Sequence, residues 1–178
     1  MTPSAAPPGG TRPTSAELVS RALERRAGLN RPDNSTYRLL HREADGVPGL
    51  TLDRFGDCLI ANLYDDVEAD PALLAAARES TGARAVYVKR RPTQPSRLTD
   101  GERAALAPTT PALGDPVAET IAIENGARFE IRPSAGLSVG LFPDMREVRA
   151  AVRALSRGKR VLNCFAYTCA FGVYAGLG

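Results

Sequence analysis

Apolar and polar residues alternate in short runs along the first half of the chain, and these runs predict a small module of strands and helices. After the capping-box sequence Thr14-Ser-Ala-Glu17, four apolar residues recur at helical spacing, so a helix is expected to begin there and to stop near Gly28. Short apolar runs follow, separated by Asp-Gly, Pro-Gly and Gly-Asp turns. The expected elements are strands at 37–41, 50–53 and 58–64, a helix at 70–77 that starts at Asp70-Pro71, and a strand at 85–89.

The second half of the chain shows a hairpin and a helix. Residues 120–131 alternate on both sides of Asn125-Gly126, a dipeptide that suits a type I′ turn. A helix is expected at 144–156, with Asp144 at its N-cap or in its first turn, where free backbone N–H groups favour an acid. One face of this helix is apolar and should pack inward, through Met145, Val148, Val152 and Leu155.

The last segment, residues 161–178, combines an apolar run, a tight turn and the start of a helix. This order is typical of the first unit of a doubly wound α/β domain, where backbone N–H groups at the helix start favour an anionic group. Phe165 and Tyr167 are placed to flank an adenosine. No GxGxxG sequence is present, so a dinucleotide-dependent oxidoreductase is disfavoured. On these residues alone, a buried core strand is as good an interpretation as a cofactor turn.

Composition narrows the class of protein without naming an activity. With 178 residues, 43% of them hydrophobic, the chain fits one average domain or two small ones. Lys and Arg outnumber Asp and Glu by 23 to 20, an excess too small to identify a nucleic-acid-binding protein. No apolar run has transmembrane length, residues 1–15 lack a signal-peptide core, and the three cysteines do not form a disulfide framework. A cytoplasmic protein is therefore expected.

Two basic stretches and several acidic turns have competing interpretations. Arginines at 146, 149, 153 and 157 form a stripe that is either a solvated helix face or a surface for anions. Lys89-Arg90-Arg91 begins a polar stretch, 90–100, that is either a solvated linker or a contact to RNA phosphate. The acidic residues Asp45, Asp53 and Asp57 occupy tight turns, so no metal site is expected.

Three sequence blocks, taken together, resemble one family. They are Arg42-Glu-Ala-Asp-Gly-Val-Pro-Gly-Leu-Thr-Leu-Asp-Arg-Phe-Gly-Asp57, then Glu124-Asn-Gly-Ala-Arg-Phe-Glu130 with Gly140-Leu-Phe-Pro-Asp-Met-Arg146, and then Leu162-Asn-Cys-Phe-Ala-Tyr-Thr168. In order and spacing these blocks are similar to the S-adenosylmethionine-dependent cytosine-C5 methyltransferases of large-subunit (23S) ribosomal RNA. The resemblance runs from about Leu18 to the last residue. It implies an α/β fold, in which a small central α/β domain precedes the hairpin, helix and first strand of a Rossmann-like methyltransferase domain.

The resemblance also assigns candidate site residues. It implies that Phe142, Asp144 and Arg146 lie in the segment that closes over the cofactor S-adenosylmethionine. The residues matching the first cofactor-binding motif are Asn163, Phe165, Tyr167 and Thr168. Candidate contacts to RNA are Arg90, Arg91, Arg149 and Arg153.

The chain departs from the family pattern at several places. Cys169 stands where the family usually has glycine, so its Cβ and sulfur are expected to crowd or strain the turn. Ser138-Val139 replaces a common Lys-Thr pair and removes a cation. The N-terminal PUA domain of relatives is expected to be missing, and their catalytic cysteine is expected to lie beyond Gly178. Cys164 is interpreted as a buried structural cysteine.

These observations lead to one preferred hypothesis and one alternative. The chain is expected to be the N-terminal portion of an enzyme that methylates C5 of a cytosine in ribosomal RNA, and to be inactive alone. The alternative is a non-catalytic RNA-binding or interaction module; ribosomal RNA is the expected partner, and a homodimer is possible. The expected organisation is a disordered tail at 1–13, a helix and central domain at 14–92, a linker at 93–116, and an incomplete methyltransferase domain at 117–178.

Overall fold

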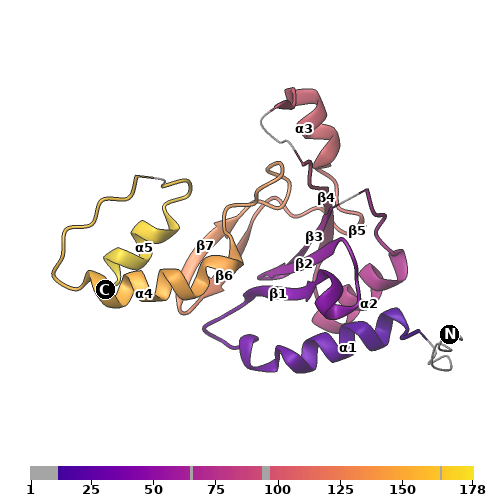
Figure 1. Cartoon of the computed structure of the whole chain (residues 1–178), viewed down its shortest axis with the longest axis horizontal. Helices are drawn as coiled ribbons and strands as arrows, with labels where there is room; N and C mark the ends of the chain where they lie inside the picture. Colours follow the sequence, from indigo (N-terminus) through magenta and orange to yellow (C-terminus); the bar gives the residue numbers. More distant parts are fainter. Residues whose placement is uncertain (1–11, 65, 94–96, 165) are drawn as a thin grey trace, which may run out of the picture.

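The computed structural model describes residues 12–64, 66–93, 97–164 and 166–178, and it has a mixed α/β fold as expected (Figure 1). Most of the tail expected at 1–13 lies outside these residues. A five-stranded sheet forms one half of the molecule, and a two-stranded hairpin with two helices forms the other. No helix in the described ranges is both long and apolar enough to cross a bilayer.

The five-stranded sheet has its strands in chain order, β1-β2-β3-β4-β5. The pairing of β3 with β4 is parallel and the others are antiparallel, because a helix crosses from β3 to β4. The strands are β1 (Thr36–His41), β2 (Leu50–Phe55), β3 (Cys58–Leu63), β4 (Ala85–Arg90) and β5 (Leu113–Gly114). The sequence therefore predicted the first four strands within a few residues at each end.

Two helices cover one face of this sheet (Figure 1). The first, α1 (Ser15–Arg25), begins with the expected capping box, since Thr14 accepts from the Glu17 N–H and the Glu17 carboxylate accepts from the Thr14 N–H. The second, α2 (Pro71–Thr81), is capped by the Asp70 side chain and has proline in its first turn. Helix α1 ends at Arg25 and is followed by a short 3₁₀ turn, η1 (Ala27–Leu29).

The opposite face of the sheet faces the hairpin, because side chains on a strand alternate between faces. On β3, Leu59, Ala61 and Leu63 pack toward the helices, whereas Cys58 and Ile60 pack toward the hairpin. The polar residue Asn62 is the next residue of β3 on the hairpin side, and Lys89, its pairing partner on β4, lies on the same side. This face therefore carries polar side chains in a mostly apolar surrounding.

The hairpin forms as predicted from β6 (Thr120–Glu124) and β7 (Ala127–Ile131). Asn125 and Gly126 have φ values of 47° and 82°, and positive φ at both central residues is the requirement of a type I′ turn. The hairpin is bonded to the chain ahead of β1, where the Ser35 N–H donates to the Ile123 carbonyl at 2.8 Å. Gly56, in the turn between β2 and β3, allows this approach, since a Cβ there would lie 2.6 Å from the Ile121 oxygen.

The stretch expected to be a linker, 93–116, contains two elements. Helix α3 (Asp100–Leu106) begins at a capping box in which Thr99 and Glu102 exchange hydrogen bonds. The short strand β5 then pairs with β4 through Val86 and Leu113, so it extends the sheet instead of spanning between domains.

Two helices pack against each other beside the hairpin, but two expectations for this region are wrong. Helix α4 (Arg146–Ser156) leaves Val148 48% and Leu155 76% exposed, although both were expected to pack inward. Residues 161–164 form no strand, and Leu162 is 86% exposed. A strand needs a neighbour to satisfy its backbone groups, and among the described residues no strand lies beside this segment. Helix α5 (Ala170–Gly176) does follow the turn.

A buried ion pair fixes α4 and α5 to the hairpin. Arg149 is 2% exposed and donates from Nε and Nη2 to the two carboxylate oxygens of Glu124, each at 2.7 Å. Its Nη2 also donates to the Phe142 carbonyl at 2.8 Å. From α5, the Tyr174 hydroxyl lies 2.8 Å from the Glu124 backbone carbonyl and 3.0 Å from the carboxylate oxygen Oε1, and burial raises the pKa of that hydroxyl. Hairpin, α4 and α5 therefore meet at one carboxylate.

Replacing Arg149 with methionine should lower the free energy of unfolding by about 3–5 kcal/mol, because the buried Glu124 carboxylate loses its counter-charge. The measurement is urea denaturation followed by circular dichroism. Arg157→Met, at an exposed position just after α4, is the control and should change the free energy of unfolding by less than about 0.5 kcal/mol. Equal losses in the two variants would contradict the assignment.

Candidate functional site

Two cavities lie on the hairpin side of the sheet, and residues 138–139 line both. The larger has a volume of about 520 Å³ and is formed by the hairpin strand β7 with the turn before α5. The smaller, of about 270 Å³, lies between the sheet and the segment 138–144. Residues 138–140 therefore separate the two cavities, and we refer to these three residues as the wall.

The larger cavity brings together the two segments that were predicted to bind the cofactor. The Thr168 hydroxyl donates to the Gly140 carbonyl at 2.5 Å. The Phe142 and Tyr167 rings lie 5.7 Å apart between centroids and are tilted by 42°, an arrangement favoured by aromatic pairs. Residues 28 positions apart in the chain thus close one rim of the cavity.

The turn that leads into α5 has unusual backbone geometry. Tyr167 and Cys169 have φ values of 48° and 63°, in the left-handed region that glycine adopts most easily. The Cys169 sulfur lies against Gly172, where an added Cβ would be 2.4 Å from it. The strain expected at Cys169 is therefore present in the backbone. Both cysteines of this segment, Cys164 and Cys169, are exposed, so the interpretation of Cys164 as a buried residue is wrong.

The remaining cofactor candidates have distinct surroundings. Asn163 has a buried amide nitrogen, Nδ2, with no hydrogen-bond partner in the part of the chain that the structure describes. Arg146 pairs with its neighbour Glu147 at 3.1 Å, and Phe165 lies outside the described residues. Asp144 belongs to a 3₁₀ turn, η4 (Pro143–Met145), and Met145 is the N-cap of α4 without a side-chain hydrogen bond. Asp144 thus lies in the turn before α4 and lines the smaller cavity.

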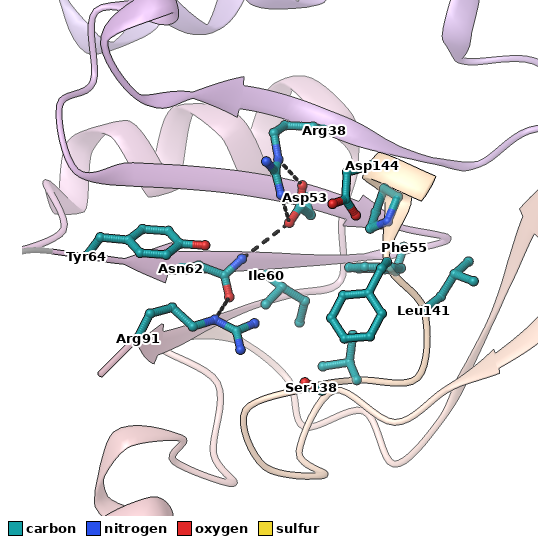
Figure 2. Close-up of a pocket in the computed structure, with 13 residues that line it drawn as sticks. Arg38, Asp53, Phe55, Ile60, Asn62, Tyr64, Arg91, Ser138, Leu141 and Asp144 are labelled. Carbon is teal, nitrogen blue, oxygen red and sulfur yellow. Dashed lines mark hydrogen bonds and ion pairs between the residues drawn. The ribbon is translucent and has the colours of Figure 1, made fainter. Parts of the chain in front are cut away.

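The smaller cavity is lined by a row of hydrogen-bonded polar side chains that crosses the sheet (Figure 2). Arg38 of β1 pairs with Asp53 of β2 at 2.8 Å, Asp53 accepts from Asn62 of β3 at 3.3 Å, and Asn62 accepts from the Arg91 Nε at 2.9 Å. Burial raises the pKa of Asp53, against the opposing effect of Arg38. Burial likewise lowers the pKa of Arg91, which remains a cation.

Sequence reasoning missed most of this row. The available signal was a polar residue within each short, otherwise buried strand: Arg38, Asp53 and Asn62. Lys89 was noted only as part of a basic run, yet it is fully buried and its ammonium donates to the Gly136 carbonyl, just ahead of the wall. Among the described residues no group of His, Cys, Asp and Glu side chains is arranged to hold a metal.

The candidate RNA-binding arginines do not form one surface. Arg149 is buried in its ion pair with Glu124, so its expected position on an exposed stripe is wrong: the pair with a carboxylate outweighs solvation of this guanidinium. Arg153 is half-buried on α4. Arg90 pairs with Glu68 on the surface at 2.5 Å, and Arg91 lines the smaller cavity.

Comparison with known proteins places this site in a family. The sequence pattern of the S-adenosylmethionine-dependent methyltransferases matches residues 42–178, which is more than half of the chain. This range includes every residue that lines the larger cavity and all but Arg38 of those that line the smaller one. The chain belongs to the S-adenosylmethionine-dependent methyltransferase family.

Curated relatives of this chain carry names that refer to ribosomal RNA. It is 36% identical over 166 residues to the ribosomal RNA large subunit methyltransferase I of Shewanella denitrificans, a match covering 90% of this chain and 40% of the relative. It is 35% identical over 177 residues to a ribosomal RNA large subunit methyltransferase of Deinococcus radiodurans, covering 92% and 41%. The chain therefore spans about two fifths of the length of these relatives.

Solved structures give the same assignment of the fold. The structure of SMU.776, described as a methyltransferase and crystallised with SAH, matches with a TM-score of 0.76 and 25% identity over 92% of this chain and 41% of that one. A S-adenosylmethionine-dependent methyltransferase structure from Streptococcus mutans matches with a TM-score of 0.75 and 26% identity, covering 92% and 42%. The expected α/β fold of the chain is thereby confirmed.

Replacing Cys169 with glycine should raise the free energy of unfolding by about 1 kcal/mol, because glycine adopts positive φ without steric strain. Urea denaturation under reducing conditions measures the change. Cys164→Gly, in the same segment but without positive φ, should instead lower the free energy of unfolding by about 0.5–1 kcal/mol. Loss of stability in both variants would show that the turn at Cys169 is not strained.

The buried Lys89 should make stability depend on pH. Burial lowers its pKa from 10.5 to about 8, so between these values Lys89 binds more protons in the unfolded chain than in the native state, and its own contribution makes the free energy of unfolding rise with pH. In Lys89→Met this rise, at most about 1.4 kcal/mol per pH unit, should vanish. Urea denaturation at pH 7.5 and 9.5 tests this, with Lys159→Met at an exposed position as the control. A wild-type slope retained in Lys89→Met would refute it.

Proposed function

We propose that the larger cavity binds S-adenosylmethionine, and that the enzyme to which this chain corresponds transfers a methyl group to C5 of a cytosine in large-subunit ribosomal RNA. The observation that carries the proposal is the contact between the two predicted cofactor segments, through Thr168 with Gly140 and Phe142 with Tyr167. The names of the relatives and the SAH in a similar structure support the choice of cofactor and of RNA.

The residues around the larger cavity fit such a cofactor. Its volume of about 520 Å³ lies within the range of roughly 300–1,000 Å³ that is typical of small-molecule sites. Tyr167 supplies an aromatic surface at its rim. The Asn163 amide nitrogen does not line this cavity; it is buried near Gly172 at the start of α5 and has no hydrogen-bond partner among the described residues. When bound, the cofactor supplies an activated methyl group. Thr168, Tyr167 and Phe142 would orient it, and Arg128 of β7 offers a cation to an anionic group.

Asp144 is best assigned to a different ligand from the cofactor residues. It lines the smaller cavity together with Arg38 and Asp53, on the other side of the wall from Thr168. We therefore assign the cofactor to Phe142, Asn163, Tyr167 and Thr168 within the described residues, and we keep Asp144 for the RNA. Phe142 touches both sites, since it lines the smaller cavity and packs on Tyr167.

The reaction needs a thiolate that attacks C6 of the cytosine, and the three cysteines of this chain are poorly suited to it. Cys58 is fully buried, and burial raises the pKa of its thiol to about 12. Cys164 and Cys169 lie on the segment assigned to the cofactor. We therefore propose that this chain alone binds cofactor and RNA without turnover. Exposed cations after α4, at Arg157, Lys159 and Arg160, add to Arg90 and Arg153 as contacts to phosphate.

Removing the Thr168 hydroxyl should weaken binding of SAH about tenfold, since one hydrogen bond that closes the cavity rim is lost. The test is isothermal titration calorimetry of SAH with the 178-residue chain and with Thr168→Val. Thr81→Val is a matched control, because the Thr81 hydroxyl also donates to a backbone carbonyl, that of Ala77 at 2.7 Å, on the far helix α2.

The outcomes separate the hypotheses. Unchanged SAH affinity in Thr81→Val together with weaker binding in Thr168→Val supports the cofactor site. No SAH binding by the wild-type chain, combined with salt-dependent binding of ribosomal RNA, would favour the non-catalytic RNA-binding module. Methylation of ribosomal RNA by the purified chain would overturn the proposed lack of turnover.

A further inference from the structure

The smaller cavity has a set of polar groups that the proposed cofactor site does not use. Three members of the row across the sheet satisfy one another: Arg38 pairs with Asp53, and Asn62 donates to Asp53. They form a rigid floor, because Asp53 and Asn62 are each at most 4% exposed. What remains available to a ligand lies at the two ends of the cavity.

At one end, the Arg91 guanidinium offers unused donors. Only its Nε is engaged, with Asn62 at 2.9 Å, and among the described residues no carboxylate pairs with it. Figure 2 shows Arg91 beside Tyr64, with the terminal nitrogens of Arg91 and the hydroxyl of Tyr64 directed toward the cavity. A half-buried guanidinium without a counter-charge is a strong site for a phosphate, because its fork of N–H groups matches phosphate oxygens.

At the other end, the Asp144 carboxylate is an exposed acceptor. It has no hydrogen bond or ion pair within the described part of the chain, although it stands near the Arg38–Asp53 pair. A carboxylate is the usual acceptor for the exocyclic amine of cytosine, whereas the carbonyl of uracil at that position would repel it. Phe142, which is 46% exposed, also lines the cavity and offers a flat apolar surface to a base, whereas the Tyr64 ring is already stacked with the Arg42 guanidinium at 4.0 Å.

We propose that the smaller cavity binds one unpaired cytidine nucleotide of the substrate RNA, with its amine on Asp144, its phosphate on Arg91 and its base against Phe142. The volume of about 270 Å³ suits a single nucleotide better than a longer segment. An unpaired base is required, because a stacked and paired base does not present its edge to a pocket. The inference rests on the proposed function, and it places an RNA subsite across the wall from the cofactor.

The base-reading part is tested with mononucleotides and the 178-residue chain. Titration of CMP and UMP, followed by NMR chemical shifts, should show tighter binding of CMP. In Asp144→Asn the ratio of CMP to UMP affinity should fall about tenfold, because the amide also offers a donor to the uracil carbonyl. Asp100→Asn, at an exposed position on α3, is the control and should keep the wild-type ratio. An unchanged ratio in Asp144→Asn would overturn the assignment of Asp144.

The phosphate part is tested by comparing CMP with the nucleoside cytidine. Arg91→Gln should weaken CMP about tenfold and leave cytidine binding as in the wild type, since only CMP has the phosphate. Arg103→Gln, an equal loss of charge on exposed α3, should change neither. Weakening of both ligands in Arg91→Gln would mean that the variant disturbs the cavity itself, against the proposed role of Arg91.

Measuring SAH binding in the same samples separates this inference from the proposed function. Binding of SAH without binding of CMP at millimolar concentration overturns the nucleotide subsite and leaves the cofactor site intact. Binding of CMP with the expected variant effects but without SAH overturns the cofactor site and supports a nucleotide pocket. Because Asp144 is exposed and makes no side-chain hydrogen bond or ion pair among the described residues, Asp144→Asn should fold normally.

Discussion

The arrangement of the C-terminal half depends on one buried carboxylate, that of Glu124. A carboxylate can remain charged in an apolar core only if its lone pairs and its charge are matched, and here Arg149 and Tyr174 supply both. These two partners come from α4 and α5, whereas Glu124 belongs to the hairpin. Because Arg149 also donates to the Phe142 carbonyl, the same pair positions the segment that contains the cavity wall. Apolar packing by α4 contributes little to this arrangement, because most of the apolar side chains of α4 are exposed.

Local signals in the sequence were sufficient for the first half of the fold and for the hairpin. Capping boxes, Asp70-Pro71 and Asn125-Gly126 act through neighbouring residues only, so their effect is visible without the rest of the chain. The same type of signal, Thr99 with Glu102, was present ahead of α3 and would have located that helix. The stretch 93–116, which was interpreted as a linker, therefore contains a helix that local information alone could have predicted.

The parts that could not be predicted depend on contacts between distant residues. Arg149 and Arg157 look alike in a helical stripe, and only the position of Glu124 across the hairpin decides which of them is buried. The strand expected at 161–164 is absent because pairing requires a neighbour, which no periodicity can provide. Similarly, the resemblance assigned Phe142 and Tyr167 to two segments of one cofactor site, but only the folded structure shows that their rings lie 5.7 Å apart. Asp144 matched the same motif and yet faces the sheet.

The wall between the two cavities is thin, and it is held from both sides. Lys89 holds the adjoining Gly136 from the sheet, and Thr168 holds Gly140 from the turn before α5. A ligand that displaces this backbone on one side must change the shape of the other cavity as well. Thermodynamic linkage then fixes the result: whatever factor one ligand applies to the affinity of the second, the second applies to the first. Ligands that displace this shared backbone would therefore be energetically coupled, and the order in which they bind would not alter the size of that coupling.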